Sequence, residues 1–241
     1  MLEEVIILGC GPTHVECKYH CEVWGVNGTY NFAKRLDKLF MTDEPDEVAT
    51  CWYDMVKVKV ANPTLVFPIP YPRFQNKGFR VEIYPMDGIR EKFKTRFFSN
   101  SIAYMLAYAL YHTKSIQTPD DPMPRVIEGY EKIYLFGIDM MTSATYIQEK
   151  GGVEYWMGVA LGMGVKVINT KGSATGKTWN GKMYGYWGLQ EQEMIKEKLM
   201  APWELVRVSK SSESQGYDWV KQGDEFVKVK TVTKAGEEVV A

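Results

Sequence analysis

The chain has 241 residues, of which 45% are hydrophobic and 24% are charged, and its formal net charge is −1. This length and composition fit a globular protein with one sizeable core, and the lack of a basic block disfavours nucleic acid as the main ligand. No run approaches the roughly 20 apolar residues that a membrane span needs, and no secretory leader opens the sequence, so we expect a cytoplasmic protein.

The four cysteines do not predict a disulfide framework, since three of them crowd between Cys10 and Cys21. Together with His14 and His20, Cys10, Cys17 and Cys21 offer the ligand types that zinc accepts, but their spacings match no common zinc motif. We therefore expect buried cysteines with incidental histidines and assign no metal site, with zinc binding as the alternative.

In chain order, the first third of the sequence predicts strands that alternate with helices and turns. The predicted strands cover residues 5–8, 21–26, 38–42, 64–69 and 79–84. A short helix is expected over 30–36 and a second one over 46–58. Prolines at 68, 70 and 72 limit the segment after the fourth strand to a loop or a sheet edge.

Further along, an apolar helix is predicted over 102–110, because Ser99, Asn100 and Ser101 precede it with side chains that are preferred at an N-cap. Residues 113–124 are polar with three prolines and indicate a surface insertion. A strand over 133–136, a helix over 149–161 and a strand over 165–168 follow. Beyond them we expect a helix over 189–200 and an exposed strand over 226–232.

This alternation predicts the α/β class, with a Rossmann-like, mostly parallel sheet flanked by helices and a C-terminal extension. We expect a nucleotide-binding domain over residues 1–170 and an extension of loop, helix and tail over 171–241. Ligands of such sheets lie at the carboxyl ends of the strands. The turn that starts at Gly9, together with Asn27, Asp43 and Asp139, falls at such ends.

The turn after the first strand reads Gly9-Cys10-Gly11-Pro12-Thr13. Glycines that break a buried strand leave amide N–H groups pointing outward, and such a turn commonly holds phosphate. His14 replaces the third glycine of the dinucleotide fingerprint, and Asn27 stands where an acidic residue would bind the ribose of NAD. The sequence therefore predicts a nucleotide site that is not an NAD site.

Four motifs follow one another in a familiar order: Gly-x-Gly-Pro-Thr at Gly9, Trp24-Gly25-Val26-Asn27, Ser99-Asn100-Ser101 with the apolar helix, and Gly137-Ile138-Asp139 after a strand. In this order the chain resembles the Rossmann-like superfamily that contains the bacterial sialyltransferases using CMP-sialic acid. The superfamily also contains the 6-hydroxymethylpterin pyrophosphokinase-like proteins, which include flagellar glycosylation accessory factors. The resemblance covers about residues 4 to 168.

The resemblance implies roles for particular residues. The turn from Gly9 to Thr13 would cradle phosphate, Asn27 would bind ribose or base, and the helix start at Ser99, Asn100 and Ser101 would reach the donor. Asp139 would lie beside the reacting phosphates. Two tyrosines would donate hydrogen bonds to phosphate, as tyrosines do in the sialyltransferases; these are Tyr184 and Tyr186.

The function that we expect is a nucleotide-dependent transferase, similar to a glycosyltransferase, that uses a nucleotide-activated sugar. No histidine follows Asp139, so the general base stays open among Asp43, Asp139 and Glu154. One alternative is a pterin-type pyrophosphokinase, in which strand-end carboxylates bind Mg²⁺ and ATP. Another is a non-catalytic nucleotide-binding protein. A homo-oligomer is left open.

Overall fold

The computed structural model describes residues 2–42, 54–75, 77–119, 121, 123–140, 144–170, 172–176, 216–222 and 225–231. For residues 72–73, 144–147, 216–222 and 225–231 the description is limited to the backbone. The chain divides into two compact units, Met1–Val206 and Arg207–Ala241. The expected boundary after residue 170 stays a prediction.

The first unit contains an eight-stranded sheet in the order β5-β4-β3-β2-β1-β7-β6, with β8 also paired to β7. All neighbours are parallel except β6 and β7. This confirms the predicted fold class. The strands are β1 (Leu2–Leu8), β2 (Glu22–Val26), β3 (Lys38–Phe40), β4 (Thr64–Phe67), β5 (Val81–Ile83), β6 (Lys114–Ile116), β7 (Arg125–Phe136) and β8 (Lys166–Asn169).

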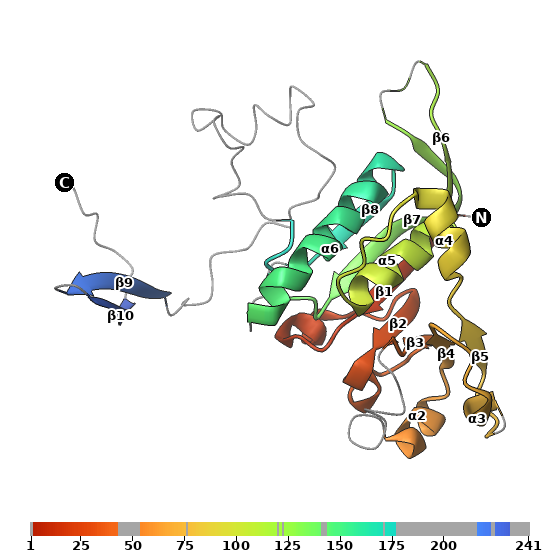
Figure 1. The fold of residues 1–241 in the computed structure, drawn as a ribbon, viewed down its shortest axis with the longest axis horizontal. Coiled ribbons are helices and arrows are strands. Elements are labelled where there is room, and N and C mark those ends of the chain that lie inside the picture. The colour runs from red at the N-terminus through yellow and green to blue at the C-terminus, as the bar shows by residue number, and fades with distance from the viewer. Residues whose placement is uncertain are drawn as a thin grey trace. The chain divides into compact units, whose positions relative to one another are not determined.

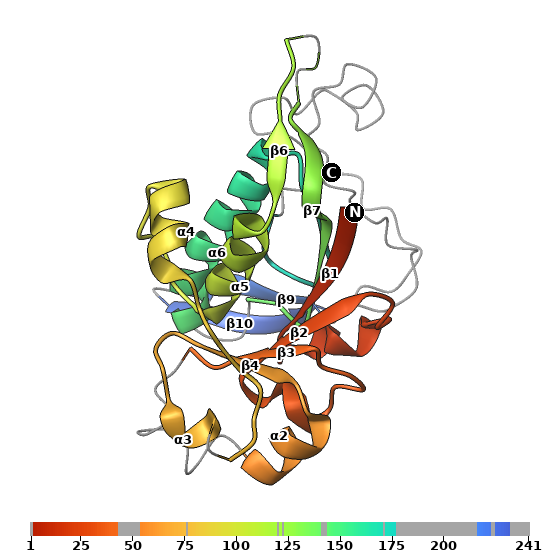
Figure 2. The same cartoon turned by 90° about the vertical axis from the view of Figure 1, so that its right-hand side faces the viewer.

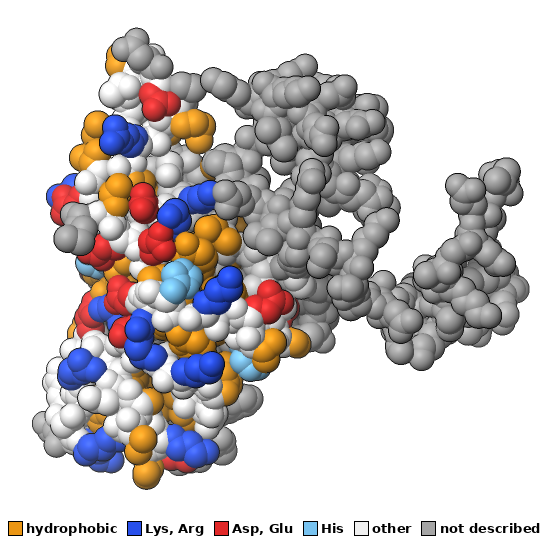
Figure 3. All heavy atoms as spheres, turned by 180° about the vertical axis from the view of Figure 1, so that it is seen from behind, with side chains coloured by type: hydrophobic (Ala, Val, Ile, Leu, Met, Phe, Trp, Pro, Cys, Tyr) orange, Lys and Arg blue, Asp and Glu red, His pale blue; other side chains and the backbone are white. Residues whose placement is uncertain are grey.

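Helices flank this sheet, and three of them lie along one of its faces (Figures 1 and 2). These three are α4 (Met86–Phe93), α5 (Ser101–Tyr111) and α6 (Ala144–Gly162). The other face packs against shorter segments, which are η2 (Asn27–Asn31), α2 (Met55–Ala61) and α3 (Pro72–Gln75), while η1 (Pro12–Glu16) follows β1. Figure 3 shows the molecule from behind, where hydrophobic, basic and acidic side chains are interspersed.

Strand alternation divides the core between the two faces of the sheet. Val5 and Ile7 pack in the cluster with α5 and α6, whereas Ile6 and Leu8 pack in the cluster on the opposite face. All four side chains are fully buried, which explains why β1 is a continuous apolar run. The sheet therefore holds its central strand rigidly and fixes where β1 ends.

The second unit contains an antiparallel pair of strands, β9 (Gly216–Gln222) and β10 (Glu225–Thr231). The strand expected over 226–232 is confirmed as β10, while β9 was not predicted. The helix expected over 189–200 lies outside the described residues. In the described part of the chain, no helix is long and apolar enough to cross a membrane.

Three predicted elements need correction. Residues 30–36 do not form a helix, because the chain leaves β2 through Asn27 at φ +51° and closes only the 3-10 turn η2. The predicted insertion over 113–124 contains β6, which pairs with the start of β7. In place of a helix over 46–58, α2 begins at Met55 because the Asp54 side chain caps it, and residues 46–53 lie outside the described residues.

Helix α4 was not predicted, since its sequence carries a weak apolar signal. Ile89 is its one fully buried side chain, and charged residues fill much of the remainder. Lys92 of this helix donates to the carbonyl oxygens of Leu110, Tyr111 and Thr113 at 2.7–2.9 Å, so α4 satisfies the end of α5.

Glu82 lies on β5, the strand at one edge of the sheet, and the pKa of its carboxyl predicts how stability changes with pH. Burial raises the pKa of Glu82, but hydrogen bonds from Lys38 and Tyr108 outweigh burial and keep the pKa below its ordinary value of 4.5. A carboxyl whose pKa is lower in the folded state contributes stability above its unfolded pKa and loses it as the pH falls through the folded pKa. We expect Glu82→Gln to cost about 1 kcal/mol at neutral pH.

The difference between wild type and Glu82→Gln should shrink as the pH falls from about 5 to about 3. Urea unfolding at several pH values measures it. Glu91→Gln, an exposed change on α4, is the matched control and should follow wild type throughout. If the difference in unfolding free energy between wild type and Glu82→Gln stays constant with pH, the carboxylate of Glu82 does not have the stabilising role described.

Candidate functional site

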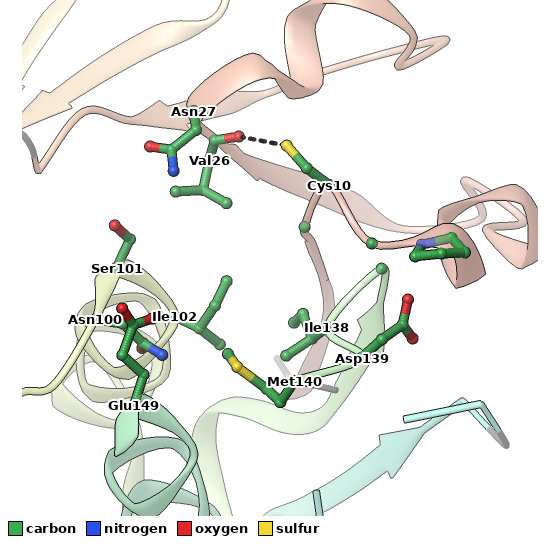
Figure 4. A pocket seen from close by; sticks show the side chains of 14 residues that line it. Cys10, Val26, Asn27, Asn100, Ser101, Ile102, Ile138, Asp139, Met140 and Glu149 are labelled. Carbon is green, nitrogen blue, oxygen red and sulfur yellow. Dashed lines mark hydrogen bonds between the residues drawn. The ribbon is translucent and has the colours of Figure 1, made fainter. Parts of the chain in front are cut away.

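A cavity of about 220 Å³ opens at the carboxyl ends of β1, β2 and β7, beside the start of α5 (Figure 4). This volume lies just below the range of about 300–1,000 Å³ that is typical of pockets for drug-sized ligands. The lining residues are Gly9, Cys10, Gly11, Pro12, Val26, Asn27, Asn100, Ser101, Ile102, Gly137, Ile138, Asp139, Met140 and Glu149.

The cavity lies where the strand order reverses. From β1 the chain adds β2, β3, β4 and β5 outward on one side, then returns to the other side of β1 for β7 and β8. In open parallel sheets, the crevice outside the carboxyl ends at such a switch point is the usual ligand site. The topology therefore singles out this cavity within the described part of the chain.

The turn after β1 is bonded within the protein, contrary to expectation. The amides of Gly9 and Gly11 donate to the carbonyl oxygens of Phe136 and Gly137, both at 2.8 Å. The amide of Thr13 donates to Asp139 at 3.1 Å, and Pro12 has no N–H. The expectation that the amides of Gly9, Gly11 and Thr13 point outward unbonded is therefore wrong. The turn lines the cavity, and its role in phosphate binding stays a prediction.

The glycines of this turn are required by a close backbone approach. A Cβ on Gly9 would lie 2.4 Å from the carbonyl oxygen of Gly137, and a Cβ on Gly11 would lie 2.3 Å from an Asp139 carboxylate oxygen. Gly137 has φ +67°, and a Cβ there would lie 2.4 Å from the carbonyl oxygen of Gly9. The absence of a Cβ at these glycines thus allows the turns after β1 and β7 to approach each other closely.

Asp139 and Thr13 complete this junction. The Thr13 hydroxyl donates to Asp139 Oδ1 at 2.5 Å and accepts from the amide of Gly137 at 3.0 Å and from the hydroxyl of Thr170 at 3.0 Å. The Asp139 side chain points away from Asn27 (Figure 4). Both of its oxygens bind Thr13, so the carboxylate holds the turn in this structure.

Asn27 and Cys10 form the wall on the β2 side. Asn27 follows β2 at φ +51°, a conformation that asparagine tolerates better than most residues. The thiol of Cys10 donates to the carbonyl oxygen of Val26 at 3.7 Å (Figure 4). Desolvation of the sulfur raises the pKa of Cys10, so this thiol is not an activated nucleophile.

The start of α5 forms the opposite wall. Asn100 Oδ1 caps the helix by accepting from the amide of Ala103 at 2.9 Å, while its Nδ2 is buried and has no hydrogen-bond partner in the described structure. The Ser101 hydroxyl contacts the Thr42 hydroxyl at 2.5 Å. Ser99 does not line the cavity, because its hydroxyl donates to the backbone carbonyl of Glu149 at 2.6 Å.

Of the remaining predicted residues, the structure describes only Glu154. Glu154 lies on α6 and does not line the cavity; its carboxylate pairs with Lys150 at 3.3 Å and accepts from the amide of Gly176 at 2.9 Å. Asp43, Tyr184 and Tyr186 lie outside the described residues, so their expected roles stay predictions.

Glu149 lines the cavity and was not predicted. It stands at the predicted start of a helix, where an acidic residue is usually read as a favourable first-turn charge. The helix in fact begins at Ala144, so Glu149 lies more than one turn inside α6 and faces the start of α5 (Figure 4). The sequence pattern did not show that α6 begins at Ala144, so it did not predict that Glu149 lies at the cavity.

No family model matches the chain, and no curated protein matches it. Two solved structures of the sialyltransferase CstII from Campylobacter jejuni are similar in part. The complex with cytidine-5'-monophosphate is 15% identical with a TM-score of 0.42, over 69% of this chain and 79% of that chain. The complex with CMP-3FNeuAc is 16% identical with a TM-score of 0.42, over 70% and 80%. Similarity at this level establishes no shared activity.

The Thr13 hydroxyl can be tested by Thr13→Val, which keeps the shape of the side chain. Because the change removes the hydroxyl that Asp139 Oδ1 and the Gly137 amide bind, we expect a loss of about 1–3 kcal/mol in the free energy of unfolding. Denaturant unfolding measures it. Thr118→Val, an exposed change, is the control, and equal stability of the two variants would contradict the role of Thr13.

Proposed function

We propose that the protein is a nucleotide-dependent transferase, similar to a glycosyltransferase, that binds a nucleotide-activated sugar in the cavity at the ends of β1, β2 and β7. The observation that carries this proposal is the position of the cavity at the switch point of a parallel sheet. Nucleotides are a major class of ligand at such positions.

The start of α5 is the part of this cavity that is best suited to bind an anion. An α-helix leaves its first amides without intrahelical partners, and its dipole makes that end electropositive. Ser101 and Ile102 begin α5 and line the cavity. A phosphate of the nucleotide would therefore bind at this helix start, and not at the turn after β1.

The side-chain amide of Asn100 adds a hydrogen-bond donor to this anion-binding position. Its buried Nδ2 has no partner in the described structure, and an unpaired buried donor costs about 1–3 kcal/mol. A ligand oxygen would remove that cost after a small shift of the cavity wall. Asn27, across the cavity, carries an amide that both donates and accepts, as recognition of a ribose or a base requires.

Glu149 is the general base that the cavity favours. Transfer to an acceptor hydroxyl requires a group that removes its proton, and a carboxylate can do so. Asp139 is engaged by Thr13, whereas Glu149 reaches into the cavity from α6. The leaving nucleotide phosphate would be stabilised by the α5 start.

A screen of thermal stability with CMP, UDP, GDP and ATP tests the binding site. A ligand that binds only the native state raises the melting temperature. Stabilisation by CMP or UDP supports sugar transfer, while stabilisation by ATP that needs Mg²⁺ supports the pyrophosphokinase. If none of the four nucleotides raises the melting temperature, the proposed nucleotide site is wrong.

Asn100→Asp is the sharpest variant for this screen. Aspartate keeps the side-chain oxygen that caps α5, removes the Nδ2 donor and adds a negative charge beside the proposed phosphate. We expect the apo protein to lose some stability, because the new carboxylate oxygen is buried beside Glu149, and the nucleotide affinity of the folded protein to fall at least about tenfold, which is about 1.4 kcal/mol. Asn62→Asp, an exposed change at the end of α2, is the matched control and should bind as wild type.

Glu149→Gln separates catalysis from binding. Loss of a general base typically lowers turnover by about 10²–10⁴-fold, whereas the amide leaves the cavity nearly the same shape. Release of nucleotide from CMP-, UDP- and GDP-sugars measures turnover, and the thermal shift measures binding. Unchanged turnover in Glu149→Gln would exclude this role, and nucleotide binding without turnover in wild type would favour a binding protein.

A further inference from the structure

Three side chains of different type converge at the start of β1 and β2. Glu4 lies on β1, and His20 and Cys21 directly precede β2. One ligating atom of each, a carboxylate oxygen, an imidazole nitrogen and a thiol sulfur, lies within 4.8 Å of the others. This cluster is separate from the cavity described above, which lies at the other end of these strands.

Strand pairing brings the three residues together. The register pairs Val5 with Glu22, so Glu4 and Cys21 lie next to each other one position earlier in the parallel strands. By alternation, both share the sheet face of Ile6 and Val23. The sequence alone does not reveal this pairing, because Glu4 is distant from the cysteine and histidine cluster in the chain.

Neighbouring side chains fix the orientation of Glu4 and His20. Lys132 donates to Glu4 Oε1 at 2.6 Å, and the Tyr134 hydroxyl donates to Glu4 Oε2 at 3.2 Å. The Tyr134 ring packs edge-on against the His20 imidazole, with 4.6 Å between centroids. Ligands of metal sites are typically held by such outer contacts.

We propose that Glu4, His20 and Cys21 bind a zinc ion, with solvent in the remaining position. Sulfur and imidazole donors together with one carboxylate suit Zn²⁺ and not Mg²⁺ or Ca²⁺. Tetrahedral zinc with bonds of about 2.0–2.3 Å separates its ligand atoms by about 3.3–3.6 Å. His20 Nε2 and Glu4 Oε2 are 3.8 Å apart and all three ligand atoms lie within 4.8 Å, so the atoms must approach one another by up to about 1 Å to bind the ion.

The charges and protons of this site balance. On binding, the Cys21 thiol gives its proton to solvent and forms a Zn–S bond, while His20 binds through Nε2 and Glu4 through Oε2. The carboxylate and the thiolate neutralise the ion, and Lys132 stays on the other carboxylate oxygen. His20 is exposed, which gives the ion a path from solvent.

Such an ion would anchor the segment between η1 and β2. Residues 17–20 form neither helix nor strand, and zinc would tie the end of this segment to β1. The ion would therefore raise the stability of the folded chain, since metal bound only by the native state stabilises it. This effect does not depend on the proposed nucleotide site.

Zinc content and Co²⁺ spectroscopy test the proposal. Purified full-length protein, dialysed against Zn²⁺ and then against buffer, should retain one zinc per chain and melt at a higher temperature than after treatment with a chelator. Co²⁺ in place of zinc should give a thiolate-to-cobalt charge-transfer band. Mg²⁺ should have neither effect. Retention of no zinc by wild type would overturn the proposal.

Variants assign the ligands. Cys21→Ser should lose the charge-transfer band and the retained zinc, whereas Cys10→Ser, the matched control at the other end of β1, should keep both. Tyr134→Phe keeps the ring beside His20 but removes the hydrogen bond to Glu4, and should weaken zinc binding about 10- to 100-fold. Zinc binding and a charge-transfer band unchanged in Cys21→Ser would show that another group holds the metal.

Discussion

The close approach of the backbones that follow β1 and β7 is the constraint on which the site depends. Gly9 and Gly137 pack so tightly that neither position has room for a Cβ. Because protein interiors are close-packed and barely compressible, this contact fixes both turns together. Thr13 and Asp139 then lock the two turns with hydrogen bonds to each other. The cavity wall on this side is therefore rigid before any ligand arrives.

This rigidity changes the chemical meaning of the glycine turn. The amides of Gly9, Gly11 and Thr13 stabilise the junction between two strands, so these three are engaged within the protein. The electropositive start of α5 faces the same cavity and supplies the potential that the turn does not. In the proposed function the turn would therefore form a fixed wall, and the helix start would attract the phosphate.

The two ends of β1 have different chemistry. Its carboxyl end borders a cavity whose polar lining includes two side-chain amides, the Ser101 hydroxyl and the carboxylates of Asp139 and Glu149. Its amino end holds Glu4 beside His20 and Cys21, where donors of three kinds meet within 4.8 Å. Because the strand between them is fully buried from Val5 to Leu8, both ends are held by the same packed core. The proposed nucleotide site and the proposed metal site would thus share one rigid strand.

The sequence by itself determined the fold class and most of the sheet. Apolar runs such as Val5 to Leu8 and the cap at Asn100 are local signals, because the residues of a single segment are enough to recognise them. Two short elements were not predicted: α4 has a single buried side chain, Ile89, and β6 has only three residues and forms by pairing with the start of β7.

Only the tertiary structure decided which polar groups of the site are engaged. Thr13 and its partner Asp139 are 126 positions apart, and no pattern within the first turn indicates that bond. The same holds for Glu149, which reaches the cavity because α6 begins earlier than its apolar spacing suggests. The sequence gives the type and order of the residues. Whether a hydrogen-bond donor is available to a ligand depends on contacts that form only when strands distant in the chain pair.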